Sequence, residues 1–231
     1  MTSYKNFAKI YDEIFPFDKK YFNFLSSYVD KGEIALDIGS ATGSYVKELN
    51  KAGVTAFGLE YEKEFISYRY PLCIGDMNFL PFKKNSFDFI YSIGNTICHI
   101  ESRSAFILFI QRAGKILKPK KSFLFQIINY DRIFEHNINK LPEIETENYI
   151  FYREYKYNNA VSIDFIGKVV DKKSGDTVHS FSQKLTPILY QDIIDAANRA
   201  DFNFVQFFGG VGGEKFVKDK SFLTIACFTK P

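Results

Sequence analysis

The segment from Asp37 to Gly43, Asp-Ile-Gly-Ser-Ala-Thr-Gly, has the residue types of a ligand-binding turn. It follows the apolar run Ile34–Ile38 and precedes Ser44–Lys51, which is typical of a helix. Backbone N–H groups of such a turn, together with the N-terminus of the next helix, bind ligands in α/β proteins. Glycine in a turn can also serve backbone geometry alone. The segment therefore indicates a nucleotide or cofactor site, with an ordinary strand–helix turn as the alternative.

Two further acids follow apolar segments. Glu60 ends the run Thr55–Glu60, about 20 residues after the glycine turn, where a doubly wound fold places an acid on ribose hydroxyls. Asp76 follows the next apolar run. Its carboxylate can accept a hydrogen bond from an exocyclic amine while Met77 packs on a flat ring. The alternatives are a solvated carboxylate for Glu60 and a turn or capping residue for Asp76.

A third polar segment, Gly94 to His99, follows the apolar run Phe87–Ile93. Loops after the carboxyl ends of central strands bind ligands in open sheets. Gly94 and Asn95 suit a close approach of the backbone to such a ligand. His99 could accept or relay a proton near neutral pH, or it could only fix the loop through a hydrogen bond.

The spacing of apolar residues predicts the elements that position these side chains. Strands are predicted at Ile34–Ile38, Thr55–Glu60, Leu72–Gly75, Phe87–Ile93 and Ser122–Ile128, with helices at Ser44–Lys51, Glu62–Ser67 and Ser102–Leu117. A helix at Pro187–Ala200 and strands at Phe202–Phe208 and Phe222–Phe228 follow. The alternation predicts an α/β fold with a parallel sheet and helices on both faces. The last two strands are joined by a turn-rich segment, which favours an antiparallel final pair.

Two segments depart from this alternation. Residues 148–185 alternate polar and apolar residues between polar turns, which predicts about three antiparallel strands that form an inserted lid or small sheet. Residues 1–30 predict two short helices, broken near Pro16, that form an N-terminal cap. The length of 231 residues fits a single domain spanning 1–231.

Composition limits the classes of partner and site. The net charge of +3 comes with scattered lysines, which gives no strong electrostatic argument for a nucleic-acid partner. Cys73, Cys98 and Cys227 lie far apart without metal-ligand spacing, and we predict no metal site and no disulfide framework. The runs around Cys73 and Cys227 predict buried thiols. No signal-peptide pattern or membrane-spanning run is present, so we expect a cytoplasmic protein without a membrane partner.

The four strand ends together resemble the class I S-adenosylmethionine-dependent methyltransferases, from Ile34 to Phe228. The resemblance implies a doubly wound, Rossmann-like seven-stranded sheet with an antiparallel last strand, and a small antiparallel β insertion after the fifth strand. It implies S-adenosyl-L-methionine as the cofactor. The Gly39–Gly43 turn would hold its methionine moiety, Glu60 its ribose, and Asp76 with Met77 its adenine. The implied cofactor-binding residues are Asp37, Gly39, Ser40, Ala41, Gly43, Glu60, Tyr61, Asp76, Met77, Ile93, Gly94 and Asn95. Ala41 stands where the family usually has glycine.

A narrower resemblance concerns the acceptor. The segment Gly94–His99 is similar to the Gly-Asn-Ser/Thr-x-x-His segment of glycine N-methyltransferase-like enzymes. Asn129-Tyr130-Asp131 is similar to a segment of the same group and of amino-sugar N-methyltransferases. This implies methylation of a small molecule at an amine nitrogen, with the N-terminal helices and the insertion closing over the site.

The chemistry needs an in-line nucleophile, because a sulfonium methyl group is already activated. The candidate catalytic residues are His99 for a proton, Asn129 to orient the amine and Tyr11 to cap the pocket. Arg153 and Lys184 could bind a carboxylate of the acceptor. Packing for Asn129 and Tyr11, and solvent exposure for Arg153 and Lys184, are the alternatives.

Other functions stay open from the sequence. A nicotinamide-dependent dehydrogenase is disfavoured, because the turn lacks Gly-x-Gly-x-x-Gly. A cofactor-binding module without catalysis fits the same motifs. A tRNA-modifying methyltransferase is disfavoured by the small net charge. The sequence leaves the acceptor unnamed and is compatible with a monomer or a homodimer.

Overall fold

The structure is a computed structural model that describes residues 4–66, 70–157, 162–200, 202 and 204–231. Its strands form two sheets. The larger sheet has seven strands in the order β10-β11-β5-β4-β1-β2-β3, and the smaller sheet has four in the order β6-β7-β8-β9. In the larger sheet β11 pairs antiparallel with β10 and β5, whereas the other pairs are parallel. The predicted α/β fold with an antiparallel last strand is therefore confirmed.

The elements have the following bounds. The larger sheet contains β1 (Ile34–Ile38), β2 (Thr55–Glu60), β3 (Leu72–Ile74), β4 (Phe87–Ser92), β5 (Leu117–Ile128), β10 (Phe204–Phe208) and β11 (Leu223–Thr229). The smaller sheet contains β6 (Lys140–Glu145), β7 (Tyr149–Tyr157), β8 (Ile163–Asp171) and β9 (Thr177–Leu185). The helices are α1 (Tyr4–Ile14), α2 (Lys19–Ser26), α3 (Ser44–Lys51), α4 (Arg103–Ile116), α5 (Tyr130–Glu135) and α6 (Tyr190–Arg199). Short 3₁₀ turns are η1 (Lys63–Phe65), η2 (Met77–Phe79) and η3 (Thr96–His99).

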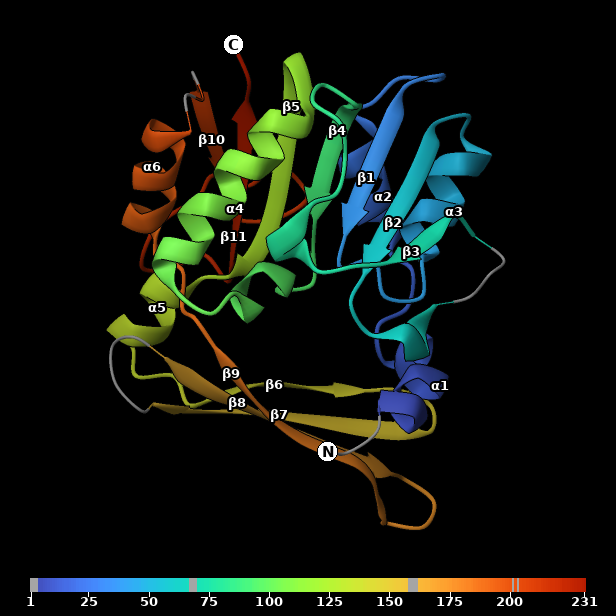
Figure 1. The fold of residues 1–231 in the computed structure, drawn as a ribbon. Coiled ribbons are helices and arrows are strands. Elements are labelled where there is room, and N and C mark those ends of the chain that lie inside the picture. The colour runs from blue at the N-terminus through green and yellow to red at the C-terminus, as the bar shows by residue number, and fades with distance from the viewer. Residues whose placement is uncertain (1–3, 67–69, 158–161, 201, 203) are drawn as a thin grey trace.

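Helices cover both faces of the larger sheet, as the alternation predicts. Phe106 of α4 and Ile193 of α6 belong to the core on one face. Leu25 of α2 and Leu49 of α3 belong to the core on the other face. The smaller sheet lies as a separate layer below the carboxyl ends of β1, β2 and β4 (Figure 1). This arrangement leaves those strand ends facing the smaller sheet. No helix of the described residues has the length and apolar character needed to cross a bilayer.

The smaller sheet, called the inserted sheet from here on, has four strands where the sequence predicts about three. The additional strand, β6, lies at the edge of the sheet and contains Pro142. Its pairing with β7 is irregular between Leu141 and Ile144. A proline without an N–H is tolerated at a sheet edge or a bulge, but it hides the strand pattern in the sequence.

Other elements also differ in extent. The helix predicted at Glu62–Ser67 is only the 3₁₀ turn η1, and Ser67 lies outside the described residues. Phe65 is the one buried side chain of that turn, so no apolar face sustains a longer helix. Helix α5 was not predicted, and β5 begins at Leu117 rather than Ser122. The strand predicted from Phe202 begins at Phe204, and residue 203 lies outside the described residues.

The two predictions of buried thiols have different outcomes. Cys227 is buried as predicted, but Cys73 is exposed, so that prediction is wrong. Cys73 lies on β3, the three-residue strand at the edge of the larger sheet. An edge strand so short is covered incompletely by the elements around it.

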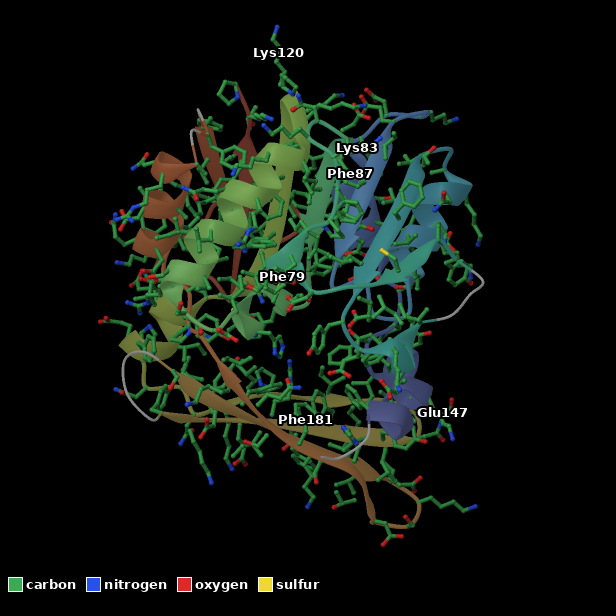
Figure 2. The ribbon with its side chains drawn as sticks, viewed as in Figure 1. Phe79, Lys83, Phe87, Lys120, Glu147 and Phe181 are labelled. Carbon is green, nitrogen blue, oxygen red and sulfur yellow. The ribbon has the colours of Figure 1, made fainter. Side chains whose placement is uncertain are left out.

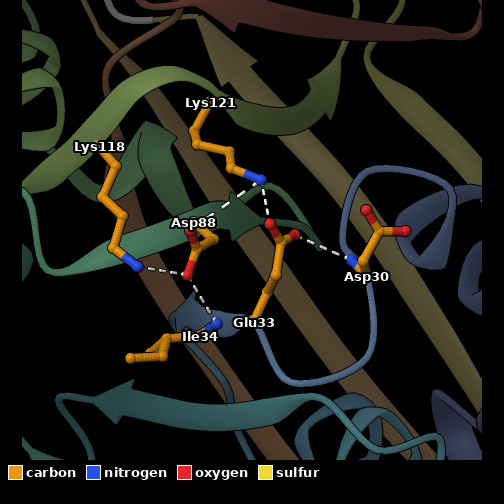
Figure 3. Close-up of polar contacts among 6 residues, drawn as sticks. All are labelled: Asp30, Glu33, Ile34, Asp88, Lys118 and Lys121. Carbon is orange, nitrogen blue, oxygen red and sulfur yellow. Dashed lines mark hydrogen bonds and ion pairs between the residues drawn. The ribbon is translucent and has the colours of Figure 1, made fainter.

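A charged cluster joins β1, β4 and β5 at the end of the sheet remote from the inserted sheet (Figure 3). The Asp88 carboxylate, only 6% exposed, accepts from Ile34 N at 3.0 Å and from Lys118 Nζ at 2.7 Å. Lys121 lies between Glu33, with which it pairs, and Asp88, 4.0 Å away. Burial raises the pKa of Asp88, but the bonds from Lys118 and Ile34 and the lysine charges outweigh it, and the pKa is lowered.

We expect Asp88→Ala to lower the free energy of unfolding by about 2 kcal/mol, because Lys118 and the Ile34 N–H lose their shared acceptor. Urea titration at neutral pH measures the loss. Since the folded-state pKa of Asp88 is lowered, its contribution is present above the unfolded-state pKa and disappears as the pH falls through the folded-state pKa. The difference between wild type and Asp88→Ala should therefore shrink in acid; a constant difference would contradict this account.

Candidate active site

A cavity of about 1120 Å³ lies between the carboxyl ends of the larger sheet and the inserted sheet. Its walls come from α1, the loops after β1, β2, β3 and β4, and the strands of the inserted sheet. Figure 2 shows Phe181, one of the lining residues, on the inserted sheet below the larger one. Pockets for one drug-sized ligand usually measure about 300–1,000 Å³. The cavity is therefore large enough for more than a cofactor alone.

Three residues of the glycine turn beside this cavity have a left-handed backbone conformation. Gly39, Ala41 and Gly43 have φ of 79°, 45° and 80°. Gly43 then precedes α3 as its N-cap. A left-handed conformation is costly for residues with a Cβ, which explains why glycine is usual at the position of Ala41. The turn is thus a close-approach surface, and its lining residues include Ser40 and Thr42.

Glu60 closes the back of the turn. Its Oε2 accepts from Ala41 N at 2.8 Å, and its Oε1 accepts from Glu62 N at 2.9 Å. The side chain is 8% exposed, and burial raises its pKa although these N–H groups lower it. Each carboxylate oxygen retains a lone pair for a ligand hydroxyl. Glu60 could therefore hold both the turn and a ribose.

Asp37 is the second buried acid at this end of the cavity. It is 2% exposed, and its Oδ1 has no hydrogen-bond partner in the described part of the chain. Burial raises its pKa to about 8, the Tyr91 hydroxyl lowers it, and the Glu60 charge raises it. An orphaned carboxylate oxygen is costly in a folded protein. A ligand with a cationic group would satisfy this atom and neutralise the acidic pair.

Asp76 has the capping role and also faces the cavity. Its Oδ1 accepts from Asn78 N at 2.7 Å and from Asn78 Nδ2 at 2.9 Å, so it is the N-cap of η2. It also lines the cavity together with Met77. Tyr61 stands at the same wall, 68% exposed. The far end of a cofactor would meet these residues.

The loop after β4 supplies the opposite wall. Gly94 N donates to Gln126 Oε1 at 2.9 Å. Asn95 donates from Nδ2 to the Tyr130 hydroxyl at 3.0 Å, and its Oδ1 accepts from Ile128 N at 3.0 Å. Asn95 therefore anchors the loop with its side chain. Ile93, Gly94 and Asn95 all line the cavity, as the sequence predicts for a ligand-facing loop.

His99 projects into the cavity from η3. Burial lowers the pKa of its imidazole below the ordinary value. His99 is nevertheless exposed, at the wall of the cavity. A neutral imidazole that a ligand can reach is able to accept a proton at neutral pH. Glu101, which the sequence pattern did not single out, lines the same part of the cavity.

Tyr11 of α1 lines the cavity near Glu60 and Asp37. Its ring packs against Phe65 with centroids 4.9 Å apart, and against Phe7 at 5.7 Å. Burial raises the pKa of Tyr11, and the charges of Glu60 and Asp37 raise it further, so the hydroxyl stays protonated. Tyr11 therefore stands where a capping residue would.

Asn129 is not brought into the cavity. Its side chain is fully buried at the N-cap of α5, where Nδ2 donates to Lys218 O and Ser221 O, each at 2.9 Å. Its Oδ1 accepts from Arg132 N at 3.3 Å. The amide is thus committed to joining α5 to the loop before β11. The predicted role in orienting an amine is corrected to a structural one.

The two candidate cationic residues, Arg153 and Lys184, lie on opposite faces of the smaller sheet, because side chains alternate between faces along a strand. Arg153 pairs with Leu141 and Gly167 on the inner face of the inserted sheet and lines the cavity. Lys184 pairs with Asp164, on the face opposite that of its neighbour Gln183. Lys184 is exposed and is also one of the residues that line the cavity, so its carboxylate role stays a prediction. Gln183 and Tyr155 face inward, and counting the alternation from Phe181 could have found Gln183.

Comparison with known proteins finds a sequence family and a curated relative. Residues 36–125 match the sequence family described as Methyltransferase domain. An uncharacterized protein of Methanocaldococcus jannaschii is 30% identical over 135 residues, which cover 55% of this chain and 51% of the relative. The chain thus spans about half the length of the curated relative it matches.

Solved structures resemble the whole chain in fold. The CcbJ methyltransferase of Streptomyces caelestis superposes with a TM-score of 0.81 at 16% identity, covering 100% of this chain and 99% of that one. A S-adenosylmethionine-dependent methyltransferase of Clostridium acetobutylicum has a TM-score of 0.78 at 18% identity, covering 98% of both chains. An amino pentose methyltransferase of Micromonospora echinaspora, solved with its cofactor bound, has a TM-score of 0.64 at 15% identity, with 91% and 89% covered. These similarities establish the fold.

Proposed function

We propose that this chain, whose residues 36–125 match the family described as Methyltransferase domain, methylates a small molecule at an amine nitrogen. In this proposal its cofactor is S-adenosylmethionine, with which one of the structural neighbours was solved. The observation that carries the proposal is the pair of buried acids, Asp37 and Glu60, at the glycine turn. Asp37 has an orphaned oxygen there, and no lysine or arginine pairs with either acid in the described part of the chain. A cationic group of the cofactor would stabilise the ionised form of Asp37, whose pKa burial raises, and would give its Oδ1 a partner.

In this proposal, different residues of the cavity bind different parts of the cofactor. The turn from Gly39 to Gly43 would hold its methionine part, and Asp37 would face its ammonium group. Glu60 would bind the ribose hydroxyls, and the Asp76–Met77 wall would receive the adenine, beside Tyr61. The loop Ile93–Asn95 would complete the opposite wall. All these residues except Gly43 line the cavity.

The reaction then needs a neutral amine held in line. When bound, the cofactor supplies a methyl group on a sulfonium sulfur, which keeps the bonding electrons as the carbon–sulfur bond breaks. The amine lone pair forms the new carbon–nitrogen bond, and His99 accepts the proton that the nitrogen releases. Tyr11 would cap the pocket at the end where the two acids lie. Residues 1–30 and 148–185 would act as cap and lid within one domain.

Calorimetric titration with S-adenosylmethionine and with its demethylated product, S-adenosylhomocysteine, tests the cofactor site. Transfer of a labelled methyl group to a panel of small amines tests the reaction. Absence of cofactor binding at high micromolar concentration would refute the proposal. Binding without transfer to any amine would favour a non-catalytic module, and transfer to tRNA with steep salt dependence would favour an RNA substrate.

We expect His99→Gln to lower turnover about tenfold without changing cofactor affinity, since some of the released protons can leave through water. The pKa of His99 is lowered. Turnover of wild type relative to His99→Gln should therefore be constant at neutral pH and fall once the pH drops below the ordinary histidine range. The ratio cancels the titration of the amine itself.

His136→Gln is the matched control, because His136 contacts Asp219 O outside the cavity. Its pH profile should follow that of wild type. Loss of thermal stability in His99→Gln, with turnover per folded molecule preserved, would assign His99 a structural role instead.

A further inference from the structure

Arg153 brings a positive charge to the inner face of the inserted sheet without a carboxylate to balance it. Its Nη2 donates to Pro142 O at 2.5 Å, and its Nε is buried without a partner in the described part of the chain. The adjacent acid, Glu154, instead pairs with Lys140 at 3.3 Å. A half-buried guanidinium lacking an anion costs free energy unless a ligand supplies one.

Aromatic rings lie beside this cation. In the register of the sheet, Arg153 is opposite Gly167, and Gly167 is opposite Phe181. A Cβ at Gly167 would lie 2.3 Å from the Phe181 ring, so glycine lets that ring lie close to the sheet. Phe165 contacts Phe181 with centroids 5.5 Å apart, and both rings line the cavity. The cation and an apolar surface are therefore neighbours.

We propose that the methyl acceptor carries a carboxylate and a bulky apolar group in addition to its amine. The carboxylate binds Arg153, whose planar guanidinium suits two parallel hydrogen bonds. The apolar group lies against Phe165 and Phe181, and the amine points toward His99 and the cofactor. This inference rests on the proposed function, because it assigns the part of the same cavity that the cofactor leaves free.

Three probes that share one scaffold test the assignment: 3-phenylpropionate, propionate and 3-phenylpropan-1-ol. Each is titrated into the full chain saturated with S-adenosylhomocysteine. We expect 3-phenylpropionate to bind about tenfold tighter than either of the others, which lack one of the two groups. Arg153→Gln should weaken 3-phenylpropionate about tenfold and leave 3-phenylpropan-1-ol unchanged. Phe181→Leu should weaken 3-phenylpropionate and leave propionate unchanged.

Lys168→Gln is the control for charge, because Lys168 is exposed on β8 on the face opposite Gly167. It should bind all three probes like wild type. Equal affinity for the three probes, or an Arg153→Gln variant that keeps its affinity for 3-phenylpropionate, would overturn the inference. Affinity for S-adenosylhomocysteine reports folding of each variant. A wild type that fails to bind S-adenosylhomocysteine refutes the proposed function, whereas binding of S-adenosylhomocysteine without 3-phenylpropionate refutes only the acceptor class.

Discussion

Replacing Gly39 by valine should eliminate cofactor binding and destabilise the fold by about 3 kcal/mol or more. The sequence suggests that the new side chain would fill the space of the cofactor. The structure places a different obstacle first: a Cβ at Gly39 would lie 2.2 Å from Thr96 Cγ2 and 2.6 Å from Thr96 Oγ1. The φ of 79° adds backbone strain. Thermal unfolding and calorimetric titration measure the two losses.

A double-mutant cycle separates the clash from the strain. Thr96→Ala removes both of the nearest atoms and leaves only the Cβ of residue 96, 2.9 Å from the carbon that Gly39→Ala adds. Gly39→Ala combined with Thr96→Ala should therefore recover part of the stability that Gly39→Ala loses. Full additivity of the two substitutions would show that Thr96 is not the obstacle.

Replacing Glu60 by alanine should weaken S-adenosylhomocysteine binding by about 3 kcal/mol, or roughly a hundredfold. The sequence argues for the loss of hydrogen bonds to ribose hydroxyls. The structure adds a second cause, because Glu60 also accepts from the N–H groups of Ala41 and Glu62. Its removal leaves the Ala41 N–H unpaired and loosens the turn that would face the methionine part.

Glu60→Gln divides these two causes, since its one carbonyl oxygen replaces only one of the two acceptors. Its affinity should fall between those of wild type and Glu60→Ala. Glu48→Ala is the control for charge, because Glu48 pairs with Lys51 on α3 and does not line the cavity. Unchanged affinity in Glu60→Ala would remove Glu60 from the cofactor site.

Local patterns predict most of the larger sheet. The apolar run at β4 and the small-residue turn at Gly39–Gly43 each depend on neighbours within a few residues, so composition and spacing suffice to identify them. Edges are harder. Strand β6 contains Pro142, and β3 exposes Cys73, because an edge strand has a partner on only one side and needs no continuous apolar pattern.

The candidate site follows the same division. The strand ends at Asp37, Glu60 and Asp76 can be found from the sequence, since parallel strands bring their carboxyl ends to one edge. Asn129 differs because its partners, Lys218 and Ser221, are about 90 residues away along the chain. Nothing local distinguishes an amide committed to such bonds from one that is free for a ligand.

The sequence by itself determined the alternation of strands and helices in the larger sheet and the polar residues at its strand ends, because these depend on local spacing. Only the tertiary structure decided which side chains share the cavity. Strand register turned Arg153 inward and Lys184 outward, and packing placed Thr96 against Gly39. Those outcomes depend on pairings between distant segments, and a shift of one residue in register would have reversed the two cations.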